Sequence, residues 1–103
     1  MSVVATSLNA VTGIATGSVI QYDEPKRTFT VQVNPTTFTG GTVTLKGSLD
    51  GQNYFGLGGE AISANGGFFH VEADPSAGYT STRVDFSNAT GTGTLTAIVA
   101  AAD

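Results

Sequence analysis

The strongest structural signal in the sequence is a run of strict alternation that ends in a turn dipeptide. Between Thr42 and Leu49, every second residue is apolar or glycine: Val43, Leu45, Gly47 and Leu49. A period of two is that of a β-strand with one buried and one exposed face. Asp50-Gly51 follows, a pair that favours a type I′ turn, and a second apolar run begins at Tyr54. We predict a β-hairpin over 42–57, with Val43, Leu45, Leu49 and Tyr54 in the core.

The rest of the chain reads as strands separated by turns. Sixteen threonines and fourteen glycines in 103 residues suit strands and turns, and no segment shows helical periodicity. Residues 60–65 fit a short strand or one helical turn. Further strands are expected at 3–8, 18–22, 27–34, 68–74, 79–87 and 94–101, with turns or loops at 23–26, 36–41, 75–78 and 88–93. This spacing is typical of a sandwich or a small barrel.

The length of 103 residues predicts one domain with a modest core. We assign residues 16–103 to the β domain. Residues 1–15 are rich in small side chains and are expected to form a first strand or an extended arm. They lack the basic and apolar regions of a signal peptide, and no run in the chain is long enough to span a membrane.

Charge and cysteine content exclude several classes of function. Eight acidic residues stand against four basic ones, Lys26, Arg27, Lys46 and Arg83, which gives a net charge of −4. Four dispersed cations cannot form the basic stripe that nucleic-acid binding needs. Charged residues make up only 12% of the chain, which suggests that a partner covers part of the surface. Without cysteine there is neither a disulfide framework nor a thiolate metal site.

No motif for catalysis or metal binding is present. His70 is the only histidine and has no nucleophile motif to serve. Asp50-Gly51-Gln52-Asn53 resembles the start of a calcium loop but lacks its later oxygen ligands, and turn chemistry explains it better. We therefore predict no catalytic, cofactor or metal residues and no enzymatic activity. Several aromatic residues could form a sugar-stacking platform, although tryptophan is absent: Tyr22, Phe38, Tyr54, Phe55 and Tyr79.

The hairpin sequence Thr42–Tyr54 and the Gly-Leu-Gly after Phe55 resemble a V-x-L-x-G-S-L-D-G-x-x-W/Y pattern of small β-sandwich proteins in tailed-phage virions. Its companions are also similar: F-T-V-Q-V at 29–33, R-V-D-F-S at 83–87 and G-T-L-T-A-I-V at 93–99. The chain departs from the pattern in having Tyr54 where tryptophan is frequent. The spacing of the predicted strands gives six to eight strands, and the resemblance implies that they form an immunoglobulin-like antiparallel sandwich without catalytic residues.

The same resemblance implies a structural role on the virion. Its first form is a capsid decoration protein, made in the bacterial host cytoplasm, that binds the major capsid protein or other virion proteins on the outer surface and stabilises the head. A trimer or other homo-oligomer is expected. The alternatives are a tail or head–tail protein of the same fold and a carbohydrate-binding or adhesion module. Exposure arguments select four candidate contact residues: Tyr22, Phe38, Asp50 and Asn53.

Overall fold

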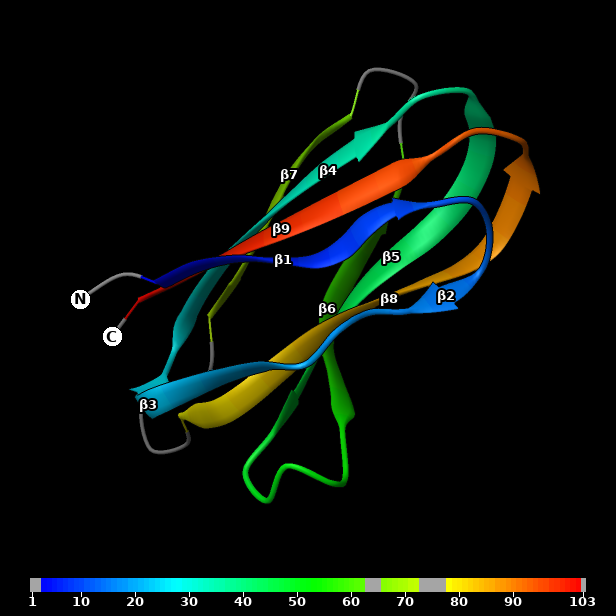
Figure 1. Cartoon of the computed structure of the whole chain (residues 1–103). Coiled ribbons are helices and arrows are strands. Elements are labelled where there is room, and N and C mark those ends of the chain that lie inside the picture. Colours follow the sequence, from blue (N-terminus) through cyan, green and yellow to red (C-terminus); the bar gives the residue numbers. More distant parts are fainter. Residues whose placement is uncertain (1–2, 63–65, 73–77, 103) are drawn as a thin grey trace.

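The computed structural model describes residues 3–62, 66–72 and 78–102, which fold into nine strands and no helix. The strands form two antiparallel sheets that pack face to face (Figure 1). The prediction of an all-β antiparallel sandwich is confirmed. The strands are β1 (Val3–Val11), β2 (Ala15–Thr16), β3 (Ile20–Lys26), β4 (Thr28–Pro35), β5 (Phe38–Ser48), β6 (Phe55–Ala61), β7 (Gly67–Glu72), β8 (Tyr79–Gly91) and β9 (Leu95–Ala102).

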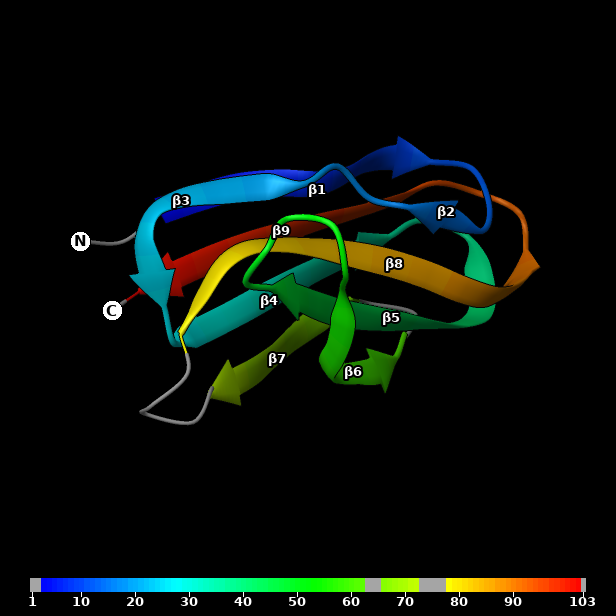
Figure 2. The same cartoon turned by 90° about the horizontal axis from the view of Figure 1, so that it is seen from below.

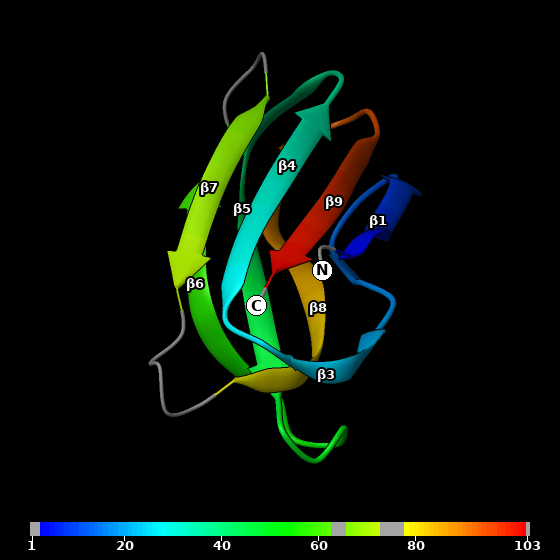
Figure 3. The same ribbon diagram turned by 90° about the vertical axis from the view of Figure 1, so that its left-hand side faces the viewer.

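The strand pairing is that of one long hairpin folded over on itself. β5 pairs with β6, β4 with β7, β2 and β3 with β8, and β1 with β9, so that each pair is enclosed in the sequence by the next. Pairing of β4 with β9 and of β5 with β8 then closes the sheets β1-β9-β4-β7 (Figure 3) and β2-β8-β5-β6 (Figure 2). In an immunoglobulin domain the first two strands lie side by side in one sheet. The observed order is instead that of a jelly roll, which corrects the immunoglobulin-like detail of the prediction.

The core lies between the sheets and follows the predicted alternation closely. Val43 and Leu45 of β5 are fully buried, as are the inward residues of β4 and β9. The buried apolar set also includes Phe29, Val31, Val33, Phe69, Val71, Val84, Phe86, Leu95, Ala97 and Val99. Period-two patterning therefore identified the inward face of most strands before any pairing was known.

Three predicted turns are strand in the structure, which corrects those assignments. Residues 23–26 continue β3 to Lys26, β5 starts at Phe38, and β8 continues to Gly91. Each contains a register shift or an unusual backbone angle: β3 shifts between Gln21 and Lys26, and Asn88 has φ of 54°. Turn-forming residues at these points mark irregular strand positions where the chain bends without leaving the sheet.

Residues 3–11 form an edge strand that pairs with β9. Of the two forms expected for the start of the chain, a strand or an extended arm, these residues take the first. Ser7 connects this strand to the opposite sheet. Its hydroxyl donates to the Ser18 carbonyl and accepts from the Val84 amide, both at 2.9 Å. A side chain at Gly17 would collide with Ser7 Oγ at 2.3 Å, so glycine is required there. The segment at Gly17 and Ser18, which bonds to Val84 and Ser7, separates β2 from β3. The structure therefore has nine strands over the described residues, where six to eight were expected.

Some predictions lie outside the described residues. β6 ends at Ala61, so the strand alternative for 60–65 holds up to that point, but residues 63–65 are not described. The same is true of Ala73, which was expected on the inner face of β7, and of most of the predicted turn at 75–78. Within the described residues, no helix is long and apolar enough to cross a bilayer.

Candidate functional site: the β5–β6 loop and its supporting cluster

Residues 49–54 connect β5 to β6 and project beyond both sheets (Figure 1). The predicted two-residue type I′ turn is wrong, because six residues separate the strands. A type I′ turn needs positive φ at both central residues. Gly51 has φ of +76°, whereas Asp50 is not among the described non-glycine residues with positive φ.

The carboxylate of Asp50 fixes the shape of this loop. Asp50 Oδ1 accepts hydrogen bonds of 2.9 Å from the amides of Gln52 and Asn53, and Oδ2 accepts one of 2.9 Å from the Asn53 side chain. The buried Ser48 hydroxyl donates to Asp50 Oδ1 at 2.8 Å and accepts from the Gly51 amide at 2.9 Å. The Asn53 and Gln52 amides, followed by the two side-chain donors, hold the pKa of Asp50 well below its usual range. The ionised Asp50 carboxylate therefore fixes the shape of the loop.

Two large apolar side chains flank the fixed loop and face solvent. Leu49 is 65% exposed and Phe55 is 70% exposed. Together with Tyr79 they line an open apolar cavity of about 280 Å³. A second cavity of about 240 Å³ is also lined by Leu49 and Asp50, with polar groups from Gln21 and other residues in its wall. The loop thus presents apolar anchors beside a polar rim, as protein-contact surfaces do.

The exposure of Leu49 corrects the prediction that it belongs to the core. The alternation of β5 ends one residue early because Ser48, opposite Ser81 in the sheet, is buried and its hydroxyl serves the loop. Thr80 Oγ1 donates to the Leu49 carbonyl at 3.1 Å, which ties down the start of the loop. Leu49 is therefore directed outward at the point where the chain leaves the sheet.

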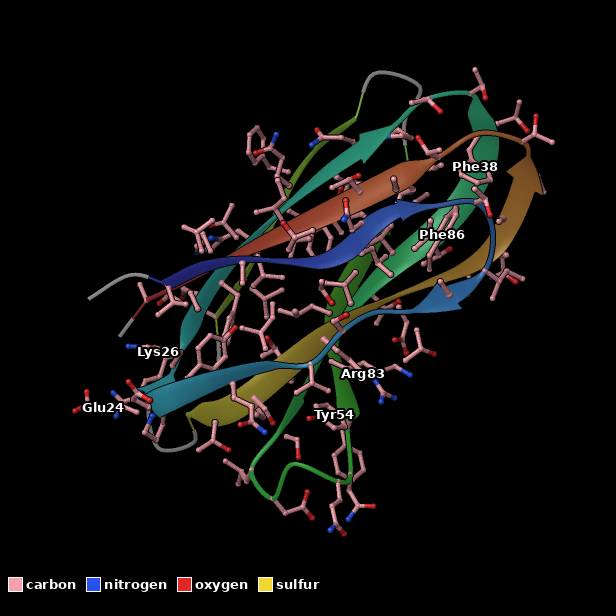
Figure 4. The ribbon with its side chains drawn as sticks, viewed as in Figure 1. Glu24, Lys26, Phe38, Tyr54, Arg83 and Phe86 are labelled. Carbon is pink, nitrogen blue, oxygen red and sulfur yellow. The ribbon has the colours of Figure 1, made fainter. Side chains whose placement is uncertain are left out.

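A chain of polar contacts supports the other end of the loop. The Tyr54 hydroxyl lies 3.1 Å from Ser81 Oγ, and Arg83 Cζ lies 4.5 Å from the centre of the Tyr54 ring (Figure 4). Arg83 Nε is 3.5 Å from Asp85 Oδ1, and Lys46 Nζ is 2.9 Å from Asp85 Oδ2. Tyr54 is half-buried and packs under the Arg83 guanidinium. This corrects the prediction that Tyr54 belongs to the core.

The position of Asp85 explains why two cations can lie side by side here. Lys46 and Arg83 are direct cross-strand partners, and like charges in such positions repel. Asp85 lies two residues from Arg83 on the same face of β8 and contacts both cations. Two of the four basic residues of the chain are therefore used to hold Tyr54 and the loop.

The four predicted contact residues divide into two pairs. Asp50 and Asn53 are exposed on the loop. Tyr22 and Phe38 are buried, so the exposure on which their selection rested is wrong. The Tyr22 hydroxyl lies 2.7 Å from Thr82 Oγ1. The Phe38 ring packs edge-on against Phe86 with 5.1 Å between centroids.

Leu49 and Phe55 were not among the predicted contact residues: Leu49 was expected in the core, and Phe55 was named only for a possible sugar-stacking platform. A signal was present in Ser48-x-Asp50, because hydroxyl and carboxylate side chains in a turn satisfy nearby backbone amides and produce a longer capped loop. His70 is exposed and lies 3.1 Å from Thr30 Oγ1 and 3.6 Å from Glu72 Oε1. Over residues 3–62, 66–72 and 78–102 no group of histidines and acids is arranged to hold a metal ion.

No family model matches the sequence, and neither does any curated protein. Solved structures share its fold over nearly the whole chain. The SPBc2 prophage-derived protein YomS has a TM-score of 0.68 at 15% identity, covering 97% of this chain and 93% of its own. PirA has a TM-score of 0.56 at 13% identity, covering 94% and 90%. The family 29 carbohydrate-binding module CBM29-2 has a TM-score of 0.53 at 9% identity, covering 97% and 91%. Identities this low establish the fold alone.

Proposed function

We propose that this protein is a structural component of a tailed-phage particle, which decorates the outer capsid and contacts it through the β5–β6 loop. The observation that carries the proposal is the exposure of Leu49 and Phe55 on either side of a loop whose backbone is held by Asp50. The resemblance of 42–54 to virion proteins and the fold shared with a prophage-derived protein support the setting.

The loop is suited to binding because it is already ordered. A segment fixed before association loses little conformational entropy on binding, so more of the contact energy appears as affinity. Complete burial of a leucine or phenylalanine side chain contributes roughly 1.5–3 kcal/mol. Leu49 and Phe55 are 65% and 70% exposed, so covering both would contribute roughly 2–4 kcal/mol.

A contact of this size becomes important when it is repeated over a shell. A subunit that binds the assembled capsid and not its dissociated parts stabilises the assembly by mass action. The low share of charged residues, 12%, is consistent with a surface that is partly covered in the particle. A place in the tail or at the head–tail junction would use the same loop against a different neighbour.

Uptake by phage heads that lack the protein tests the proposal. Wild-type protein is expected to bind the heads stoichiometrically. The double variant Leu49→Ser/Phe55→Ser is expected to bind roughly 30-fold more weakly or worse, since 2 kcal/mol corresponds to about that factor. The matched control is Val4→Ser/Ile14→Ser, which removes side chains that are 67% and 71% exposed elsewhere on the surface. Equal uptake of wild type and loop variant, or equal loss in the control, would contradict the assignment.

Saccharide binding is the second candidate function, and one surface favours it. The face of β5 and β8 that carries Lys46, Arg83 and Asp85 offers charged donors and an acceptor beside the Tyr54 ring. Charged donors and a carboxylate acceptor can bond to the hydroxyls of a sugar, and CBM29-2 shares the fold. Binding on a glycan array that is lost in Arg83→Ala, without uptake by phage heads, would favour this function over decoration.

A further inference from the structure

The two sheets end in four edges, and three of them are interrupted in the part of the chain that the structure describes. β1 has two register shifts against β9. The edge formed by β2 and β3 is split in two and contains Pro25. β6 has a register shift against β5 and three glycines. Bulges, breaks and prolines of this kind prevent further strands from adding to a sheet.

β7 is the exception. It pairs with β4 in continuous register from Gly67 to Glu72. Its sequence, Gly-Phe-Phe-His-Val-Glu, contains neither lysine nor proline, and Phe68 is 67% exposed on the outer face. A regular edge strand with an exposed aromatic side chain is a template for pairing with another strand.

The hydrogen-bonding phase of β4 shows which groups of β7 face outward. The Thr36 amide donates to the Thr94 carbonyl at 2.9 Å, at the position that continues the β4–β9 register. Because antiparallel residues alternate between bonded and non-bonded pairs, even-numbered residues of β4 bond to β9 and odd-numbered ones to β7. Their partners in β7 are also odd-numbered. The amides and carbonyls of Phe68, His70 and Glu72 therefore point away from β4.

We propose that β7 pairs with β7 of a second copy, antiparallel about a two-fold axis, which joins two four-stranded sheets into one. The register that uses all three outward-facing residues places His70 opposite His70 of the second copy and Phe68 opposite Glu72. Each of these pairs exchanges two backbone hydrogen bonds. The strand is complementary to itself in this register, and its single acidic residue faces a phenyl ring and no like charge.

This self-complementarity selects a second copy over an unrelated chain. The three pairs use backbone groups of β7 alone, so a two-fold operation satisfies both strands at once. The contact lies on the opposite sheet from the β5–β6 loop, so dimerisation and capsid binding can be tested separately. If the dimer proposal fails its test, the capsid-binding proposal is unaffected, and the converse also holds.

The mass of the protein in solution provides the first test. Light scattering after size exclusion is expected to give a dimer for wild type. His70→Pro is expected to give a monomer, because proline removes an outward-facing amide without removing a hydrogen bond to β4. Val4→Pro is the matched control: Val4 lies on β1, the other edge of the same sheet. A monomeric or trimeric wild type, or equal effects of the two prolines, would overturn the proposal.

A thiol cross-link tests the register and does not depend on a proline being tolerated. The chain has no cysteine, so a single introduced thiol reports one position. His70→Cys places two thiols on directly opposite residues, about 5.5 Å apart between Cα atoms, which is within the range of a disulfide. Glu72→Cys, on the same face, separates the two thiols by four residues, about 13 Å. Oxidation is expected to cross-link the His70→Cys variant and not the Glu72→Cys variant, and the reverse result would refute the register and the pairing.

Discussion

The hydrogen bond between Tyr22 and Thr82 provides a quantitative test of the view that Tyr22 is a core residue. The two hydroxyl oxygens are 2.7 Å apart, and Thr82 is completely buried. Tyr22→Phe would leave the Thr82 hydroxyl without this partner, and Thr82→Val would do the same to the phenol. Each single variant should lose about 1–3 kcal/mol of unfolding free energy, the cost of a buried polar group without a hydrogen bond.

The double variant distinguishes this pair from two independent losses. With both hydroxyls absent, no buried polar group is left unpaired, and the loss should fall below that of either single variant. Urea unfolding followed by fluorescence measures all four proteins at constant m-value. Losses that add in the double variant, or single losses below about 0.5 kcal/mol, would show that the two hydroxyls do not depend on each other as a buried pair.

Three further predictions concern the loop and two tight positions in the fold. Asp50 has a lowered pKa, so its stabilisation of the loop is complete above the ordinary value of about 4 and is lost as pH falls toward the lower folded value; the protection of the amides it holds against hydrogen exchange, taken relative to the intrinsic exchange rate at each pH, should fall in that acidic range and, at neutral pH, in Asp50→Ala. Ser7→Ala should cost about 1–3 kcal/mol in urea unfolding, because it leaves the buried Val84 amide unpaired. Gly41→Ala should cost a similar 1–3 kcal/mol, measured by the same method, since the new Cβ would lie 2.4 Å from the Phe86 ring.

The fold was predictable wherever local alternation decides which face of a strand is buried. Val43, Leu45, Phe29 and Val99 were all placed inward by the period of two alone. The order of the strands was not predictable in this way, because β1–β9 pairing joins the two ends of the chain and depends on no local pattern. Turn residues also mislead when a long strand bends, as Asn88 does with φ of 54° inside β8.

The candidate site was predicted in part. Turn chemistry identified Asp50 and Asn53 as exposed: the Asp50 carboxylate accepts from backbone amides within the loop, and the Asn53 side chain donates to that carboxylate. It could not identify Leu49, whose direction depends on Ser48 being used as a cap. Phe38 was misjudged because the glycine at position 41 makes room for the Phe86 ring on which it packs, a tertiary relation that the sequence does not express.

The most direct measurement of the central proposal is a cryo-electron microscopy reconstruction of phage heads saturated with this protein. We expect jelly-roll density at each occupied position, with Leu49 and Phe55 buried against the capsid and the Asp50 loop in the conformation described above. Reconstruction of bound subunits in which the β5–β6 loop points into solvent, or heads that carry no added density, would contradict it.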